Sequence, residues 1–371
     1  IKQRKNMKNI IKTLIVMLTS VSLFASAHAG SLGVSGTAKA TYNIQSGKTS
    51  AGKGLGITNE LNFTAAGELD NGYTWSYSME LDPGATSSAT DTTTEATQSA
   101  QNDDTKLTLS TPYGTVGVFI SEGGLDVEDA ASQSVYARPT DAGDPSGTAD
   151  NYTIDSYNNV QFHTPADLLP FGIAGKIAYA TDLDSYGSGN NGGVAHVQSA
   201  TYTGTDATEY QVKAAPIDGL AVGASYFKFS GDGLAKNDQS AESGAYYATY
   251  AIGSVTAGYS KAYRAQLMAD GTTTAGATTV EYYDQTNMSA AFALNDDLSV
   301  SYELEKSEAN YATSTTVTTE QKSKAVQVAY TMGGMTLALS HASHDNNGYV
   351  VGANVDQMLF AVTMADRKSV V

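Results

Sequence analysis

The sequence predicts an all-β protein, a transmembrane antiparallel β-barrel of about 16 strands. From Gly30 onward, apolar and polar residues alternate with a period of two over runs of roughly 8 to 11 residues, which is the pattern of β-strands. The connections between these runs alternate between short and long. Tyrosines lie on or beside the apolar stripes, as in the aromatic girdles of membrane barrels.

The alternation itself is regular. In one strand Leu298, Val300, Tyr302 and Leu304 are the apolar positions, and in the last strand they are Met358, Phe360, Val362 and Met364. A soluble β-sandwich would show the same alternation, with its polar half facing water. The alternation alone therefore does not decide between a sandwich and a barrel.

The lengths of the connections favour the barrel. The short ones are 70–72, 112–114, 165–172, 217–219, 252–254, 295–297 and 332–334. The long ones, rich in Gly, Ser, Thr, Asn and Asp, are 43–56, 82–104, 122–158, 181–205, 231–243, 264–279, 307–322 and 345–353. Short turns on one side of a meander and long loops on the other are the layout of a transmembrane barrel.

Two further observations bear on the barrel. Seven tyrosines support the girdles: Tyr42, Tyr77, Tyr179, Tyr226, Tyr259, Tyr302 and Tyr330. The chain beyond residue 29 leaves about 21 residues for each of 16 strands with its connection, against roughly 10 needed to cross the apolar layer. Division into 18 strands would leave about 19 residues each, so length alone leaves both strand numbers open.

The N-terminus predicts an exported protein. From Met7 the chain reads MKNIIKTLIVMLTSVSLFASAHA, in which Lys8 and Lys12 flank the start of an apolar run and an A-x-A site ends at Ala29. We therefore expect residues 1–29 to be upstream residues plus a signal peptide, and residues 30–371 to form a single barrel domain. A membrane anchor is the alternative, but the apolar run is short for a span.

The charge balance excludes some partners. The formal net charge is -17, and residues 1–29 contribute five bases and no acid, so the mature chain carries -22. Nucleic acids and anionic lipid surfaces require Lys and Arg clusters, which this composition argues against. The chain has no Cys, so no disulfide stabilises it.

Four features, in this order, carry a family resemblance: the signal peptide, the first strand GSLGVSGTAKATYNI, the hairpin LTLSTPYGTVGVFIS and the long acidic loop after the fifth strand. The chain resembles the 16-stranded general diffusion porins of Gram-negative outer membranes. The resemblance implies a long third loop folded into the lumen and passive diffusion of small hydrophilic solutes and ions. It also implies a homotrimer in contact with outer-membrane lipid and lipopolysaccharide, and no cofactor.

Strand parity predicts which side chains face the lumen. The inward set is Lys39, Glu60, Asn62, Glu80, Lys106, Gln161, His163, Lys176, Gln211, Lys213, Glu303, Glu305 and Gln327. Unpaired charges in a dry core cost several kcal/mol each, so we expect water to fill this interior. A barrel of this size is wide enough for an aqueous channel.

The loop 122–158 is the candidate constriction. It carries Glu122, Asp126, Glu128, Asp129, Asp141 and Asp144, with Arg138 as its one fixed positive charge. Inside the lumen these acids would face a basic wall formed by Lys39, Lys106, Lys176 and Lys213, and charged rings of this kind set pore selectivity. We expect a weak cation preference, and a shift toward anions when Asp126, Glu128 and Asp129 become Asn. An exposed, solvated acidic loop is the alternative.

Three other functions stay open. A substrate-specific channel for a sugar or another nutrient needs inward aromatic residues, for which Phe119, Tyr136, Phe227 and Tyr283 are candidates. An adhesive barrel would bind a partner with its long loops. An outer-membrane enzyme is disfavoured because the Ser, His and Asp of HASHD (341–345) are adjacent on a strand and point to alternating faces.

Two remaining patterns are weak. Residues 182–193 match a calcium loop only at its first, third and sixth positions, so we expect at most weak divalent-cation binding by acidic loops. At the other end, the outward stripe of the last strand continues to Asp366 in the tail DRKSVV, where the porin pattern expects an aromatic residue. We expect the natural reading frame to end near Ala365.

Overall fold

The computed structural model describes residues 31–47, 52–82, 101–141, 150–165, 168–180, 204–231, 239–266, 280–312 and 318–370. The proposed signal peptide, Asp144 and the calcium-like stretch 182–193 lie outside these residues. Among the described residues, no helix has the length and apolar content that a membrane span requires.

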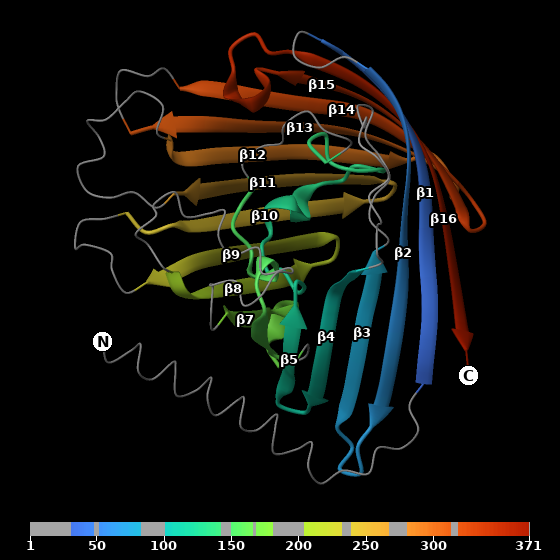
Figure 1. The fold of residues 1–371 in the computed structure, drawn as a ribbon, viewed down its shortest axis with the longest axis vertical. Helices are drawn as coiled ribbons and strands as arrows, with labels where there is room; N and C mark the ends of the chain where they lie inside the picture. Colours follow the sequence, from blue (N-terminus) through green and yellow to red (C-terminus); the bar gives the residue numbers. More distant parts are fainter. Residues whose placement is uncertain are drawn as a thin grey trace.

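Sixteen antiparallel strands form one closed barrel in which every strand pairs with its sequence neighbours and β1 pairs with β16 (Figure 1). The strands are β1 (Ser31–Gly47), β2 (Gly52–Glu68), β3 (Thr74–Asp82), β4 (Gln101–Thr111), β5 (Gly114–Ile120), β6 (Asn159–His163), β7 (Ala174–Ala180), β8 (Gly204–Ile217), β9 (Leu220–Gly231), β10 (Glu242–Ile252), β11 (Val255–Ala265), β12 (Val280–Ala293), β13 (Leu298–Tyr311), β14 (Thr319–Met332), β15 (Met335–Asp345) and β16 (Val355–Val370). Short 3₁₀ turns are η1 (Glu128–Ala131), η2 (Ile154–Ser156), η3 (Pro170–Gly172) and η5 (Asn347–Tyr349).

The predicted order of connections is confirmed except after β1. Two to five residues follow each even strand from β2 to β14, apart from β6, which ten residues join to β7. The connections after the odd strands are longer, apart from the four residues between β1 and β2. The tightest turns have two residues, as between Ile217 and Leu220, which are opposite each other. Gly219 has φ +77° there, and a Cβ on it would lie 2.4 Å from Ala251 O, so this turn requires glycine.

Several strands are longer than the sequence pattern indicates. The expected loop 43–56 is largely strand, because β1 and β2 stay paired as far as Gln45 and Gly52. Strands β13 and β14 likewise extend to Tyr311 and from Thr319, into the expected loop 307–322. Polar Gly-, Ser- and Thr-rich residues read as loop from composition, but neighbouring strands satisfy their backbone groups equally well.

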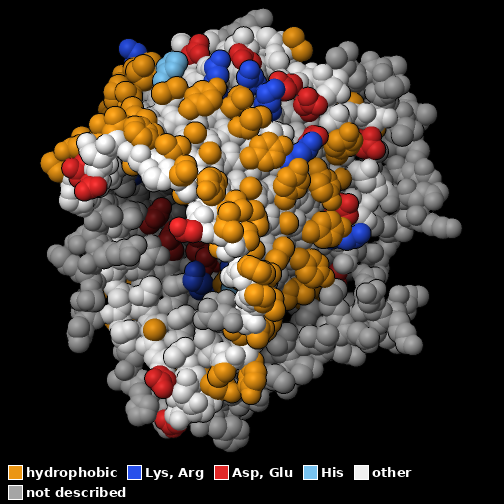
Figure 2. Space-filling model, turned by 180° about the vertical axis from the view of Figure 1, so that it is seen from behind, with side chains coloured by type: hydrophobic (Ala, Val, Ile, Leu, Met, Phe, Trp, Pro, Cys, Tyr) orange, Lys and Arg blue, Asp and Glu red, His pale blue; other side chains and the backbone are white. Residues whose placement is uncertain are grey.

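The two faces of the wall differ in chemistry. In β13 Tyr302 is 46% exposed, whereas Glu303 and Glu305 on the opposite face are 0% and 5% exposed. Figure 2 shows a broad field of hydrophobic side chains on the apolar face, beside a hollow in which acidic and basic side chains are visible. The apolar face is therefore the exposed outer face, and the polar face lies within the closed barrel.

Barrel closure involves the whole of the last strand. β16 pairs with β1 from Val355 opposite Gly47 to Val370 opposite Leu32, so the backbone of the tail after Ala365 continues the strand. This pairing is a backbone property, and it does not test where the natural reading frame ends.

Candidate functional site

The connection between β5 and β6 consists of residues 121–158, and its described parts, 121–141 and 150–158, are drawn in green in Figure 1. It leaves β5 at Ser121, which has a left-handed φ of 50°, and returns to β6 at Asn159. β5, β6 and β7 have only seven, five and seven residues. The wall is therefore shortest where this segment begins and ends.

The segment runs across the polar face of the barrel, roughly perpendicular to the strands, and side chains of the wall bond its backbone. The contacts follow the strand order: Leu125 N donates to Glu209 of β8 (3.3 Å), Val127 N to Ser225 of β9 (3.1 Å), Ser260 of β11 donates to Glu128 O (2.7 Å), Ser289 of β12 to Ala131 O (2.6 Å), Val135 N donates to Ser301 of β13 (3.0 Å) and Tyr136 N to Gln327 of β14 (3.0 Å). Each such bond contributes about 1 kcal/mol. Six wall strands therefore fix residues 125–136 in one position.

The returning part of the segment is held in the same way. Tyr152 N donates to Ser243 Oγ (3.1 Å), and Ile154 N donates to Glu209 Oε2 (2.8 Å). Glu209 therefore accepts from Leu125 in the outgoing part of the segment and from Ile154 in the returning part. Glu209 is completely buried. Glu209 was not among the predicted inward residues, although it has the parity of Gln211 and Lys213, which were; its role is to anchor the segment.

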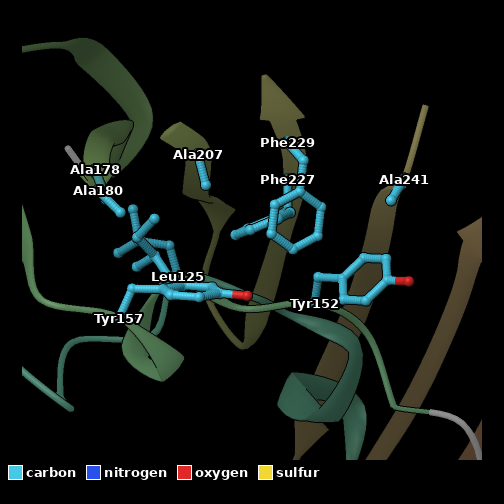
Figure 3. Close-up of a cluster of buried hydrophobic side chains, with 10 residues drawn as sticks. Leu125, Tyr152, Tyr157, Ala178, Ala180, Ala207, Phe227, Phe229 and Ala241 are labelled. Carbon is cyan, nitrogen blue, oxygen red and sulfur yellow. The ribbon is translucent and has the colours of Figure 1, made fainter. Parts of the chain in front are cut away.

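An apolar cluster joins the segment to the wall (Figure 3). Tyr152 and Tyr157 of the segment contact Phe229 of the wall at ring distances of 5.0 and 6.1 Å in edge-to-face geometry. The wall offers alanines opposite these rings, namely Ala178, Ala180, Ala207 and Ala241. The expectation that water fills the whole interior is therefore wrong on this side of the barrel, where small wall residues leave room for a packed core.

The segment lies against the backbone of the wall at Gly258 of β11. A Cβ on Gly258 would lie 1.8 Å from Ala131 O, which is also the acceptor for Ser289 Oγ. Real Cβ atoms do not approach a carbonyl oxygen so closely, so any side chain at this position displaces the segment. Sequence periodicity assigned Gly258 no role, because a glycine in a strand carries no signal of its contact partner.

Arg138 of the segment forms ion pairs with four acidic residues. Its guanidinium is 8% exposed and binds both carboxylate oxygens of Asp141, at 2.9 Å from Nε and 3.1 Å from Nη2. It also contacts Asp150 (3.3 Å), Glu305 of β13 (3.5 Å) and Asp129. Burial acts to lower its pKa, but the bond to Asp141 and the charges of Glu305 and Asp129 outweigh that effect and raise it. Arg138 therefore stays charged.

The predicted acids divide into two groups. Asp126 accepts from Ser225 Oγ (2.9 Å), Asn151 Nδ2 (3.1 Å) and Glu128 N (2.9 Å), and Glu128 is 7% exposed and accepts from Asn151 N. These two hold the segment together. Asp129, Asp141 and Asp150 have side chains 55%, 49% and 56% exposed. Asp150 was not among the residues predicted from sequence, yet it belongs to the exposed group.

The predicted basic residues also divide. Lys106 forms an ion pair with Glu122 (2.6 Å), and Lys39 lies over the ring of Tyr136 (5.8 Å). Lys176 is opposite His163 in the β6–β7 pair and is near enough to Lys213 and Lys106 for electrostatic repulsion between the three ammonium groups. Three of the four lysines therefore form one group on the wall from β4 to β8, and Lys39 contacts the segment from β1.

Crowding of carboxylates gives this site a pH dependence near neutrality. Protein surrounds most of the Asp129 carboxylate although its side chain is partly exposed; this burial raises its pKa, Arg138 opposes it, Asp141 and Asp150 raise it further, and the result is about 7. Burial, with Asp126 and Asp129, also raises the pKa of Glu128. Negative charge is therefore gained between pH 6 and 8, where ordinary carboxyls are fully ionised.

We expect the cation preference of the protein in a bilayer to increase from pH 6 to pH 8, as Asp129 loses its proton. The measurement is the reversal potential under a potassium chloride gradient at both pH values. The variant Asp129→Asn should remove most of this dependence. A variant that keeps the full dependence would assign it to another group.

The HASHD stretch does not assemble a catalytic triad. His344 is 1% exposed on the polar face and contacts Ser323 (2.9 Å), while Ser343 and Asp345 lie on the opposite face of β15. The predicted alternation of these residues is confirmed. Within the described residues, no group of three or more His, Asp or Glu is placed to hold a metal ion.

Comparison with solved structures shows the porin fold. The chain superposes on OmpF of Salmonella typhi, in complex with daunomycin, with a TM-score of 0.64 and 12% identity over 92% of this chain and 100% of that one. The chain also superposes on an anion-selective porin from Comamonas acidovorans with a TM-score of 0.60 and 11% identity, over 91% of this chain and 100% of that one. A third match is OmpT of Vibrio cholerae, an outer membrane protein, in its trimer form. Its TM-score is 0.58 and its identity 12%, over 91% of this chain and 100% of that one. No family model and no curated sequence matches the chain.

Proposed function

We propose that the protein is an outer-membrane channel of a Gram-negative bacterium, through which small hydrophilic solutes and ions diffuse passively. The observation that carries this proposal is the closed 16-stranded wall with an apolar outer face and a charged segment fixed across its polar face. An apolar outer face suits lipid, and a polar inner face suits water. The channel uses no cofactor and catalyses no reaction.

The finer properties belong to the same proposal. Export requires removal of residues 1–29, and the segment 121–158 narrows the lumen. The exposed carboxylates Asp129, Asp141 and Asp150 outnumber the one buried Arg138 at this point and give a weak cation preference. The barrel forms a homotrimer, which the trimeric form of its structural neighbour supports, and it contacts lipopolysaccharide.

The test is planar-bilayer recording of the refolded full chain. We expect stepwise conductance in potassium chloride and a reversal potential of the sign given by a cation-preferring pore. Absence of conductance from correctly folded barrel would overturn the channel, and the barrel would then be better explained as an adhesin. Clear anion preference would overturn only the charge argument.

Selectivity has its own test at Asp141 and Asp150. The double variant Asp141→Asn/Asp150→Asn removes two half-exposed charges, and we expect the cation-to-anion permeability ratio to fall by about a factor of two, since rings of charged side chains set selectivity. The double variant Asp296→Asn/Asp297→Asn, in a short turn, removes the same charge as a control. In this double variant Arg138 keeps Asp129 and Glu305 as partners, whereas loss of Asp126 and Glu128 removes the bonds to Ser225 and Asn151.

A substrate-specific channel is the second candidate, and one feature favours it. Tyr283 and Tyr349 form a ring pair at 5.2 Å on the polar face, and the guanidinium of Arg264 lies 5.8 Å from the Tyr283 ring. Flat rings beside a polar path suit sugar stacking. Of the other predicted inward aromatics, Phe119 and Phe227 are buried. Block of the single-channel current by a sugar, lost in Tyr283→Ala, would favour this candidate.

A further inference from the structure

Arg264 of β11 lies on the polar face of the barrel, opposite Ser243 of β10. It is partly exposed, and among the described residues no carboxylate is within ion-pair distance of its guanidinium. Within the same residues it makes one hydrogen bond, from Nη1 to Asp150 O at 2.8 Å, and its Nε is buried without an acceptor. Arg138, in contrast, forms ion pairs with four acids. The described part of the fold therefore leaves the charge of Arg264 unused.

The bond to Asp150 O does not require a charge. Neutral serines of the wall hold the segment in the same way, since Ser260 donates to Glu128 O and Ser289 donates to Ala131 O. A charged group that tyrosines partly cover loses hydration, which a serine hydroxyl does at a lower cost. Attachment of the segment therefore explains the bond but not the choice of arginine.

Three tyrosines surround the guanidinium. It lies 4.7 Å from the ring centre of Tyr152 and 5.8 Å from that of Tyr283. The ring of Tyr349 is 5.2 Å from the Tyr283 ring, and its hydroxyl bonds Ser307 Oγ at 2.7 Å. Tyr152 is buried, whereas Tyr283 and Tyr349 are partly exposed. The cluster thus joins a fixed positive charge to two rings that a solute can reach.

Tyr349 is held in a backbone conformation that residues with side chains rarely adopt. Its φ is +62°, in the left-handed region. The turn η5 that carries it is bonded to the wall, because Gly348 N donates to Gln321 Oε1 of β14 at 2.8 Å. Strained backbone of this kind gathers at ligand-binding sites. Here it places the Tyr349 ring beside Tyr283.

The cluster lies on the long-loop side of the segment. Arg264 is the last residue but one of β11, and Tyr349 belongs to the connection between β15 and β16. Both connections follow odd strands, and the longer loops of outer-membrane barrels are extracellular. Ser260, which bonds η1, precedes Arg264 in β11 and lies deeper in the barrel. A solute that enters from outside therefore meets the cluster before η1.

Two acids near the cluster limit what it can bind. The carboxylate of Asp150 is 3.3 Å from Arg138, so its charge is partly offset. Glu281 is two residues before Tyr283 in β12. Negative charge in the neighbourhood weakens the attraction of a small anion to Arg264. Contact with the tyrosine rings therefore has to contribute to binding as well as charge.

We propose that Arg264, Tyr283 and Tyr349 form a binding site for a sugar that carries a carboxylate, a hexuronate. The guanidinium donates to the carboxylate, and the apolar C–H face of the sugar ring packs on the tyrosines. Tyr152 of the segment keeps the guanidinium in place. The inference rests on the channel under Proposed function and gives the solute class for the tyrosine pair that favours a substrate-specific channel.

The experiment is single-channel recording of the refolded full chain in potassium chloride, with solutes added on the long-loop side. The probes are glucuronate, glucose, which has the ring without the carboxylate, and acetate, which has the carboxylate without the ring. We expect glucuronate to block the current at about tenfold lower concentration than either, the factor that one charge-assisted hydrogen bond contributes. Calorimetric titration of the barrel in detergent measures the same binding without a current.

Three variants assign the block to the cluster. Arg264→Gln keeps an N–H donor for Asp150 O but removes the charge, and glucuronate should then block only as weakly as glucose. Tyr283→Leu should weaken the block by both sugars. The control is Lys261→Gln, which removes a positive charge from the outer face of the same strand and should be blocked like the wild type. An unchanged protease pattern over residues 122–158 verifies that the segment stays in place.

Equal block by glucuronate and glucose in the wild type would overturn the proposal, as would a wild-type block in Arg264→Gln or an equal loss in Lys261→Gln. Acetate as effective as glucuronate would also overturn it, in favour of a simple anion site. Each of these failures leaves the potassium chloride conductance intact. Failure of the proposed channel abolishes that conductance, so the two failures are distinguishable.

Discussion

Gly258→Ala is expected to increase the single-channel conductance, by about twofold or more if the segment leaves the lumen of so wide a barrel. The methyl group would lie 1.8 Å from Ala131 O, so Ala131 must move away from β11. That movement also breaks the bond from Ser289 Oγ and pulls on η1, where Ser260 bonds Glu128 O. Overpacking of this kind typically costs 1–3 kcal/mol. We expect this cost to weaken the attachment of the segment to the wall and to leave the hydrogen bonds between strands intact.

The control for Gly258→Ala is Gly175→Ala in β7. A Cβ at Gly175 would lie 3.6 Å from Thr164 Cγ2, an ordinary contact, so this variant adds the same methyl group to a strand without a clash. Its conductance should equal that of the wild type. An unchanged conductance in Gly258→Ala, with a folded barrel, would mean that the position of Ala131 does not limit ion flow.

The barrel could be predicted from the sequence because its pattern is local. Alternating residues such as Tyr302 and Glu303 show directly which face each strand residue takes, and turn residues such as Gly219 mark where strands reverse. Both signals depend on neighbours within a few positions. Strand count, connection order and most inward residues were therefore accessible without coordinates.

The arrangement of the segment could not be predicted in the same way. Its bonds to the wall strands β8 to β14 join residues about 55 to 190 positions apart, as in those of Ile154 with Glu209 and of Tyr136 with Gln327. Composition gave the same weight to every acid, whereas Asp126 is bonded within the fold and Asp150 is half-exposed. A serine on the polar face, such as Ser225, looks like any other strand serine until its partner is known.

Removal of the Arg138 guanidinium is the second change with a large expected effect. In Arg138→Gln the buried carboxylate of Glu305 loses its cation, and Asp129, Asp141 and Asp150 are left close together without one. Breaking a buried ion pair costs 3–5 kcal/mol; because three of these four partners are half-exposed, we expect about 3 kcal/mol. The segment should then become sensitive to protease within residues 122–158, while the strand pairs stay intact.

The same variant should increase the cation preference, since three exposed carboxylates lose their counter-charge. Arg138→Lys separates charge from geometry: it keeps the positive charge but cannot bind both oxygens of Asp141 through a planar fork. We expect it to restore the selectivity but only part of the protease resistance. If Arg138→Gln left both the reversal potential and the cleavage pattern of the wild type, Arg138 would be a surface charge with no part in holding the segment, and the proposed constriction would have to be located elsewhere.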